Sequence, residues 1–158
     1  MGAHMKNLLD RINSTDPYYG LVDDLNITKY NRDQLDAVSI GRGDDFNCGN
    51  IDDLDPTLYD GDQMYWVSLG RGVNSGYGNM EHLDVTRYTY FQLKWISLGL
   101  GDDQRFGNID DLDPSKYKSD QMYFVSLGRG EIKLYGNIDD LDPKKYDASS
   151  MQMISKSR

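Results

Sequence analysis

The sequence repeats itself every 29 residues. The octapeptide GNIDDLDP begins at Gly49, Gly107 and Gly136, and looser versions of it begin at Gly20 and Gly78. Five repeats therefore align without an insertion or deletion, over residues 20–48, 49–77, 78–106, 107–135 and 136–158. Because a repeat of this length is too short to bury a core of its own, the repeats must pack on one another. An unbroken period predicts a stacked solenoid or a closed ring.

Each repeat contains a run of aromatic and β-branched residues that predicts a β-strand. The clearest runs are 64–69, 93–98 and 122–127, and weaker ones lie at 35–40 and 151–155. Such residues are enriched in strands. A glycine-rich turn follows each run, and a short second strand such as 134–138 is expected after the turn. The sequence therefore predicts a β-hairpin in each repeat.

The start of each repeat predicts a short capped helical turn. An Asp-Pro pair places a capping oxygen before a proline whose backbone angle suits the first helical residue. The pairs are Asp55-Pro56, Asp113-Pro114 and Asp142-Pro143, and the other two repeats keep the capping residue as Asn26 and Asp84. The predicted fold class is a β-rich α+β repeat protein. It has five repeats, each a β-hairpin plus a short capped helical turn, stacked as a solenoid or closed ring.

The residues before the first repeat carry separate expectations. Residues 1–4 (MGAH) are typical of a cloning remnant, and residues 5–19 predict an N-terminal helical cap on a single domain that covers residues 20–158. The sequence shows no signal-peptide pattern and no apolar run of transmembrane length. Cys48 is the single cysteine, so no disulfide framework is expected. Together these features predict a cytoplasmic location.

The net charge of the chain indicates which kind of partner to expect. The chain has 26 acidic residues against 17 Lys and Arg, a formal net charge of -9. Such a chain repels phosphate backbones, so we expect a basic protein partner, with neither nucleic acid nor a membrane. The predicted function is non-enzymatic protein binding, in its concrete form a bacterial immunity or inhibitor protein that neutralises a basic toxin such as a nuclease. The alternatives are a calcium-dependent or carbohydrate-binding module and a structural, self-assembling repeat.

Catalysis is not expected, because the roles of an active site cannot be assigned to residues. His82 is the only histidine beyond residue 4, and Cys48 occupies a position that is aromatic in later repeats, as at Tyr77. Cys48 is therefore predicted to be a small core residue. Paired carboxylates recur in nearly every repeat, whereas an active site is usually singular. No catalytic residue is proposed.

The repeated aspartates also suit calcium, which binds several oxygen ligands from one loop. The weak candidates are Asp44, Asp45, Asp52, Asp53, Asp102, Asp103, Asp110 and Asp111. In other repeats the first acidic pair is replaced by Val73-Asn74 and Glu131-Ile132, so the shell does not repeat. Caps and turns explain most of these residues without a metal. We expect no cofactor, with calcium as the alternative.

Two further patterns bear on binding. The arginine of the Gly-Arg-Gly turn (Arg42, Arg71 and Arg129) favours an ion pair with an aspartate of an adjacent repeat over an anion-binding nest. The aromatic series Trp66, Trp95 and Phe124 favours a core stripe over a sugar-stacking platform.

The third repeat departs most from the others and supplies the predicted partner-binding residues. Two adjacent aromatic residues stand where other repeats have polar turn residues, and aromatic and arginine clusters are typical of interface hot spots. The alternative is drift in a tolerant repeat, since scattered apolar residues on a surface are normal. The predicted residues are His82, Arg87, Tyr90, Phe91, Lys94, Trp95 and Leu100.

Overall fold

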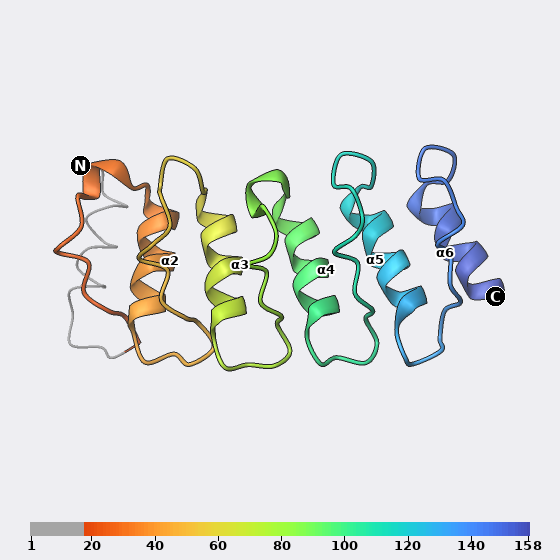
Figure 1. Ribbon diagram of the computed structural model, residues 1–158, viewed down its shortest axis with the longest axis horizontal. Coiled ribbons are helices and arrows are strands. Elements are labelled where there is room, and N and C mark those ends of the chain that lie inside the picture. The colour runs from red at the N-terminus through yellow and green to blue at the C-terminus, as the bar shows by residue number, and fades with distance from the viewer. Residues whose placement is uncertain (1–17) are drawn as a thin grey trace. The chain divides into compact units, whose positions relative to one another are not determined.

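The computed structural model describes residues 18–158, which fall into two compact units. The N-terminal unit (residues 18–74) contains the short 3-10 helix η1 (Ile27–Lys29) and helices α2 (Arg32–Arg42) and α3 (Gly61–Arg71). The C-terminal unit (residues 75–158) contains the 3-10 helix η2 (Val85–Arg87) and helices α4 (Tyr90–Leu100), α5 (Ser119–Arg129) and α6 (Ala148–Ser157) (Figure 1). Each repeat thus supplies one α-helix.

The predicted β-rich fold is wrong, because residues 18–158 contain helices and no strand. The predicted strands 64–69, 93–98 and 122–127 lie inside α3, α4 and α5, and those at 35–40 and 151–155 lie inside α2 and α6. The predicted second strand at 134–138 is a turn followed by unpaired extended chain. A repeat is therefore one helix with a long connection, and no hairpin forms. Apart from residues 18 and 19, the predicted N-terminal cap lies outside the described residues.

A polar signal before three of the five α-helices favours a helix over a strand. Before α3, the Asp60 carboxylate accepts a hydrogen bond from the Gln63 backbone N–H (2.8 Å), and the Gln63 side-chain oxygen accepts one from the Asp60 N–H (2.9 Å). This capping box satisfies two backbone donors that the first helical turn leaves without partners. Asn31 and Thr89 form the same box with Gln34 and Gln92.

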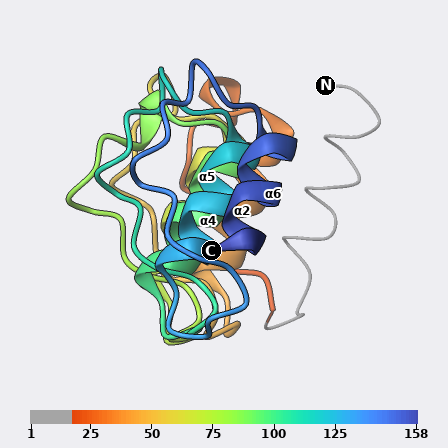
Figure 2. The same cartoon turned by 90° about the vertical axis from the view of Figure 1, so that its right-hand side faces the viewer.

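Burial on several sides explains why the helices resemble strands in the sequence. Within the C-terminal unit, α4, α5 and α6 lie side by side in one row, and the connecting segments run along one side of that row (Figure 2). Helix α5 therefore meets a helix on each flank and a connection behind it. Its buried residues include Met122, Val125 and Leu127, with the small Ser126 and Gly128 among them. A helix buried this widely loses the simple one-face pattern that identifies most helices.

Glycine near the end of four of the five α-helices, α2 to α5, permits close backbone contact. A Cβ atom added at Gly128 would lie 2.6 Å from the backbone oxygen of Gly136, and one at Gly41 would lie 2.5 Å from that of Gly49. No glycine in residues 18–158 has a positive φ. The recurring glycines therefore serve close approach of the following repeat, and left-handed turns do not require them.

The turns that begin each repeat bury its remaining apolar residues. In the fourth repeat, the Asn108 side chain accepts a hydrogen bond from the Asp110 N–H (2.8 Å), and this turn buries Ile109 and Leu112. Asp113 then accepts hydrogen bonds from the backbone N–H and the hydroxyl of Ser115 (2.9 and 2.7 Å). The capped turn predicted after the Asp-Pro pair is therefore present.

Two buried polar residues connect these turns to the helices. Ser126 in α5 donates its hydroxyl to the backbone oxygen of Gly107, 2.8 Å away in the same repeat. Gln121 donates its side-chain amide to the carbonyl oxygens of Pro143 (2.9 Å) and Tyr146 (2.8 Å) in the next repeat. The serine therefore closes each repeat on itself, and the glutamine joins it to its neighbour.

Candidate functional site

Four of the seven predicted partner-binding residues lie close together on α4. Phe91, Lys94 and Trp95 have the spacing of one helix face. The Phe91 ring is 54% exposed, and the Lys94 Nζ lies 5.0 Å from the centre of the Trp95 ring. Tyr90 contacts Phe91 edge to face, with 5.1 Å between ring centres. These residues form an aromatic and cationic patch at the start of α4.

The other three predicted residues make contacts within the protein. Leu100 ends α4 against Gly78, where an added Cβ would lie 2.2 Å from the Leu100 Cβ. His82 and Arg87 lie in the turns before α4 and face aspartates of the fourth repeat: His82 Nε2 is 3.0 Å from an Asp110 carboxylate oxygen, and Arg87 is 3.4 Å from Asp113. The structure therefore does not gather all seven residues into one surface.

The aromatic series is only partly a core stripe. Trp66 is buried, as predicted, whereas Trp95 and Phe124 are half-buried. The Trp95 ring lies 4.4 Å from the ring of Tyr123 and 5.9 Å from that of Phe106, measured between centres. Trp95 therefore belongs to a cluster of aromatic rings in the C-terminal unit.

The predicted ion pairs between repeats are present. Arg129 binds Asp139 of the next repeat at 2.8 Å, and Arg42 binds Asp52 of the next repeat at 2.7 Å. Arg129 also binds Asp111 of its own repeat at 2.6 Å, a contact that the sequence did not predict. The hydrogen bond from Arg129 lowers the pKa of Asp111 below its ordinary value. Arg42 likewise binds Asp24 of its own repeat at 2.6 Å, so each of these two arginines bridges two carboxylates.

The calcium candidates are largely engaged in local contacts. Asp45 accepts a hydrogen bond from a backbone N–H at 3.0 Å, and Asp103 pairs with Arg105 at 2.7 Å. Partners of the others include Arg42 for Asp52, Arg71 for Asp53, Ser75 for Asp102, His82 for Asp110 and Arg129 for Asp111. Over residues 18–158, no three histidine, cysteine or acidic side chains are grouped so that they could hold a metal ion.

An acidic groove lies between the two helices of the N-terminal unit. It has a volume of about 190 Å³ and is lined by Asp33 and Asp36 of α2 and by Asp62 and Tyr65 of α3, among others. Burial raises the pKa of Asp62, and the negative charges of Asp60 and Asp33 raise it further. The helix faces therefore bring like charges together, a juxtaposition that spacing along the chain did not reveal.

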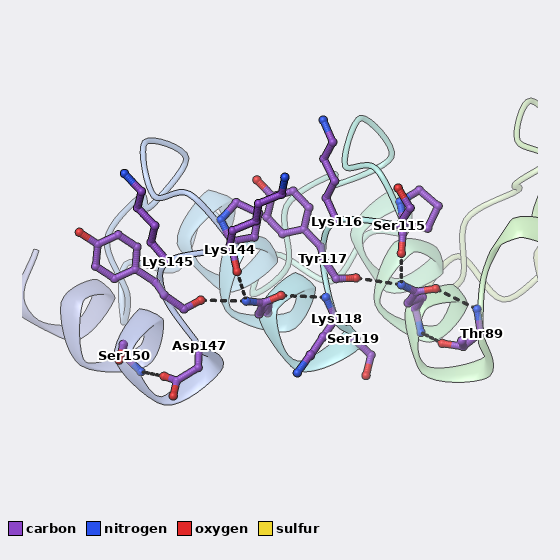
Figure 3. Close-up of a pocket in the computed structure, with 15 residues that line it drawn as sticks. Thr89, Ser115, Lys116, Tyr117, Lys118, Ser119, Lys144, Lys145, Asp147 and Ser150 are labelled. Carbon is purple, nitrogen blue, oxygen red and sulfur yellow. Dashed lines mark hydrogen bonds between the residues drawn. The ribbon is translucent and has the colours of Figure 1, made fainter.

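A larger groove of opposite charge lies in the C-terminal unit, with a volume of about 820 Å³ (Figure 3). We call it the lysine groove. It is lined by Lys116, Lys118, Lys144 and Lys145, by the carboxylate of Asp147 and by the hydrogen-bonded Gln121. Sequence reasoning missed this groove because it considered only the net charge. The uneven distribution of charge along the chain could have indicated it. Residues 18–74 hold 11 acidic residues and four Lys or Arg, whereas residues 75–158 hold 13 acidic residues and 11 Lys or Arg.

Comparison with known proteins finds no family model, no curated protein and no solved structure that matches this chain. The fold itself defines the class: a repeat protein in which each repeat is one capped helix and one connection. The predicted immunity or toxin-inhibitor class is corrected accordingly, because the chain is helical and no family or relative connects it with that class. No helix in the described part of the chain has both the length and the apolar character needed to cross a bilayer.

Proposed function

We propose that this chain is a non-enzymatic protein-binding repeat protein that takes a basic partner on the acidic groove between α2 and α3. The groove presents Asp33, Asp36 and Asp62 beside the ring of Tyr65. A lysine or arginine side chain of the partner would lie between the carboxylates and make charge-assisted hydrogen bonds with them. Tyrosine adds apolar contact area and a hydroxyl, which is why it is frequent in interface hot spots.

The observation that carries this proposal is that Asp33, Asp36 and Asp62 line one groove. The raised pKa of Asp62, caused by burial and by the carboxylates of Asp60 and Asp33, agrees with this geometry. By contrast, the pKa of Asp53 is lowered, chiefly by its hydrogen bond to Arg71. A cation that entered the groove would relieve the repulsion, so the groove favours a positively charged ligand.

The charge of the whole N-terminal unit supports the same partner. Residues 18–74 contain 11 acidic residues against four Lys or Arg. Such a field accelerates the approach of a basic protein, and salt weakens this effect. Binding is therefore expected to be sensitive to ionic strength.

The test is a capture experiment with matched variants. The immobilised chain is incubated with cell lysate at low salt and at about 0.5 M NaCl, where charges separated by more than a few ångström are screened. The groove variant is Asp33→Asn/Asp62→Asn. The control is Asp23→Asn/Asp44→Asn, which removes the same charge from exposed sites in the same unit.

We expect the wild type and the control to retain a basic protein at low salt and to release it at high salt. The groove variant should retain several-fold less of that protein. Equal retention by the groove variant would contradict the proposal, as would a captured protein that is not basic.

A further inference from the structure

The lysine groove of the C-terminal unit is a second charged surface, independent of the acidic groove. Its four lysines lie at the N-terminal ends of α5 and α6 and in the turns before them. Among residues 18–158, no carboxylate lies within ion-pair distance of these four ammonium groups, whereas Arg129 in the same unit is bound to two aspartates. Lys116 and Lys118 interact at longer range with the carboxylates of Asp113 and Asp147, but within the described part of the chain none of the four ammonium groups is held in an ion pair, so all four can contact an anionic ligand.

Lys118 occupies a position where it does not help its own helix. The other four helices begin at residues whose side chains accept a hydrogen bond from the first turn: Asn31, Asp60, Thr89 and Asp147. A lysine ammonium cannot accept one, and α5 has no such bond from its N-cap side chain. A positive charge there is also repelled by the helix dipole. Lys118 therefore adds positive charge to the groove and does not stabilise the start of α5.

The groove combines these cations with aromatic rings and prolines at repeat spacing. Lys116 and Tyr117 recur 29 residues later as Lys145 and Tyr146, and Pro114 recurs as Pro143. Packed helices lie about 8–10 Å apart. A polyproline II helix has three residues per turn and advances about 9 Å per turn, so every third side chain points the same way at the same interval. Aromatic-lined grooves are a common receptor for this conformation.

We propose that the lysine groove binds an acidic polypeptide in the polyproline II conformation, with a carboxylate at every third residue. The carboxylates would pair with Lys116 and Lys145, while Lys118 and Lys144 add positive charge. The intervening prolines would pack on Tyr117 and Tyr146. The net acidity of residues 75–158 opposes any polyanion, a peptide as much as a nucleic acid, so the fit of the peptide rests on the spacing of its carboxylates and on its prolines. The experiment therefore includes a nucleic acid as an alternative ligand.

The experiment measures fluorescence anisotropy of a labelled peptide, four copies of Glu-Pro-Pro, titrated with the full chain at low salt. A block peptide of the same composition, with all glutamates at one end, tests the spacing. We expect the block peptide to bind at least about fivefold more weakly, since affinity here depends on charge register. An oligothymidine with the same number of charges tests the nucleic-acid alternative.

Charge reversal in the groove supplies the second arm. The variant Lys116→Glu/Lys145→Glu is expected to lose at least about tenfold in affinity for the Glu-Pro-Pro peptide, because attraction becomes repulsion at two contacts. Its control, Lys133→Glu/Lys156→Glu, makes the same charge change at exposed positions of the same unit that lie outside the groove and should stay within about twofold of wild type. Circular dichroism checks that both variants remain helical.

Four results would overturn the proposal. They are no binding of the Glu-Pro-Pro peptide at low salt, equal binding of the block peptide, unchanged affinity of the groove variant, and tighter binding of the oligothymidine. None of them depends on the acidic groove, so this proposal and the proposed function fail separately.

Discussion

Replacing Gln121 with glutamate would show how strongly one side chain joins two repeats. Gln121 is 4% exposed and donates its amide group to the carbonyl oxygens of Pro143 and Tyr146. Its side-chain oxygen accepts a hydrogen bond from the Lys118 N–H at 2.8 Å. Glutamate has the same shape and retains that oxygen, so Gln121→Glu preserves the cap of α5. It replaces only the donor that reaches the fifth repeat.

The expected loss of stability follows from those two contacts. Each neutral hydrogen bond contributes about 1 kcal/mol, and a buried carbonyl left without a donor costs about 1–3 kcal/mol. Two lost bonds, together with a carboxylate facing two carbonyl oxygens, should lower the free energy of unfolding of the C-terminal unit by about 3 kcal/mol. With a urea m-value of about 1–3 kcal/mol/M, the unfolding midpoint should fall by about 1–3 M.

Acid should reverse part of this loss. Burial opposite two carbonyl oxygens raises the pKa of the new carboxyl in the folded state above its unfolded value of about 4.3. The destabilisation is therefore complete above the folded pKa. It decreases as the pH falls through that pKa, because a protonated carboxyl can again donate a hydrogen bond. The deficit is measured against wild type at each pH, which removes the effect of the other carboxylates.

The assay combines urea unfolding, followed by circular dichroism, with hydrogen exchange. Exchange should accelerate most in the fifth repeat, residues 136–158, because Gln121 holds residues 143 and 146. The control is Gln104→Glu at an exposed position, which should change stability by less than about 0.5 kcal/mol. A Gln121→Glu protein as stable as wild type at neutral pH would refute the reasoning.

Three further predictions concern other contacts. Ser126→Ala should lower the free energy of unfolding, measured by urea titration, by about 1–2 kcal/mol, because the Ser126 hydroxyl lies 2.8 Å from a glycine oxygen. Ser97→Ala should cost clearly less, because the matching contact measures 3.5 Å. Equal costs for the two variants would contradict this prediction. Arg129→Met should raise the depressed pKa of Asp111, seen by carboxyl NMR titration. It should cost at most about 1 kcal/mol at neutral pH, because the Asp111 carboxylate is 61% exposed and solvent weakens the ion pair. The pair stabilises the fold above the usual aspartate pKa, and this contribution decreases as the pH falls below that pKa. Burial raises the pKa of the Cys48 thiol, so a thiol reagent should react slowly with the native protein and rapidly with the protein unfolded in urea. Fast labelling of the native protein would contradict the core position of Cys48.

The regular features of this chain can be predicted from its residues because they depend on local chemistry. The 29-residue period, the capped turn at Asp113, the arginine–aspartate pairs and the core position of Cys48 all follow from side chains that act over a few residues or from repetition. The charged grooves do not follow in this way. Asp33 and Asp62 occupy equivalent positions of adjacent repeats, so the 29-residue period makes them neighbours, but only the packing of α2 on α3 combines them with Asp36 and Tyr65 in one groove.

The choice between strand and helix also depended partly on local residues and partly on tertiary contacts. The run 64–69 has the composition of a strand, and the prediction took no account of the capping pair Asp60 and Gln63 that precedes it. The local preference of these residues could not distinguish a strand from a helix, because a helix buried by neighbours on several sides needs apolar residues nearly all round. Contacts between repeats therefore chose the helix, and with it the positions of both grooves.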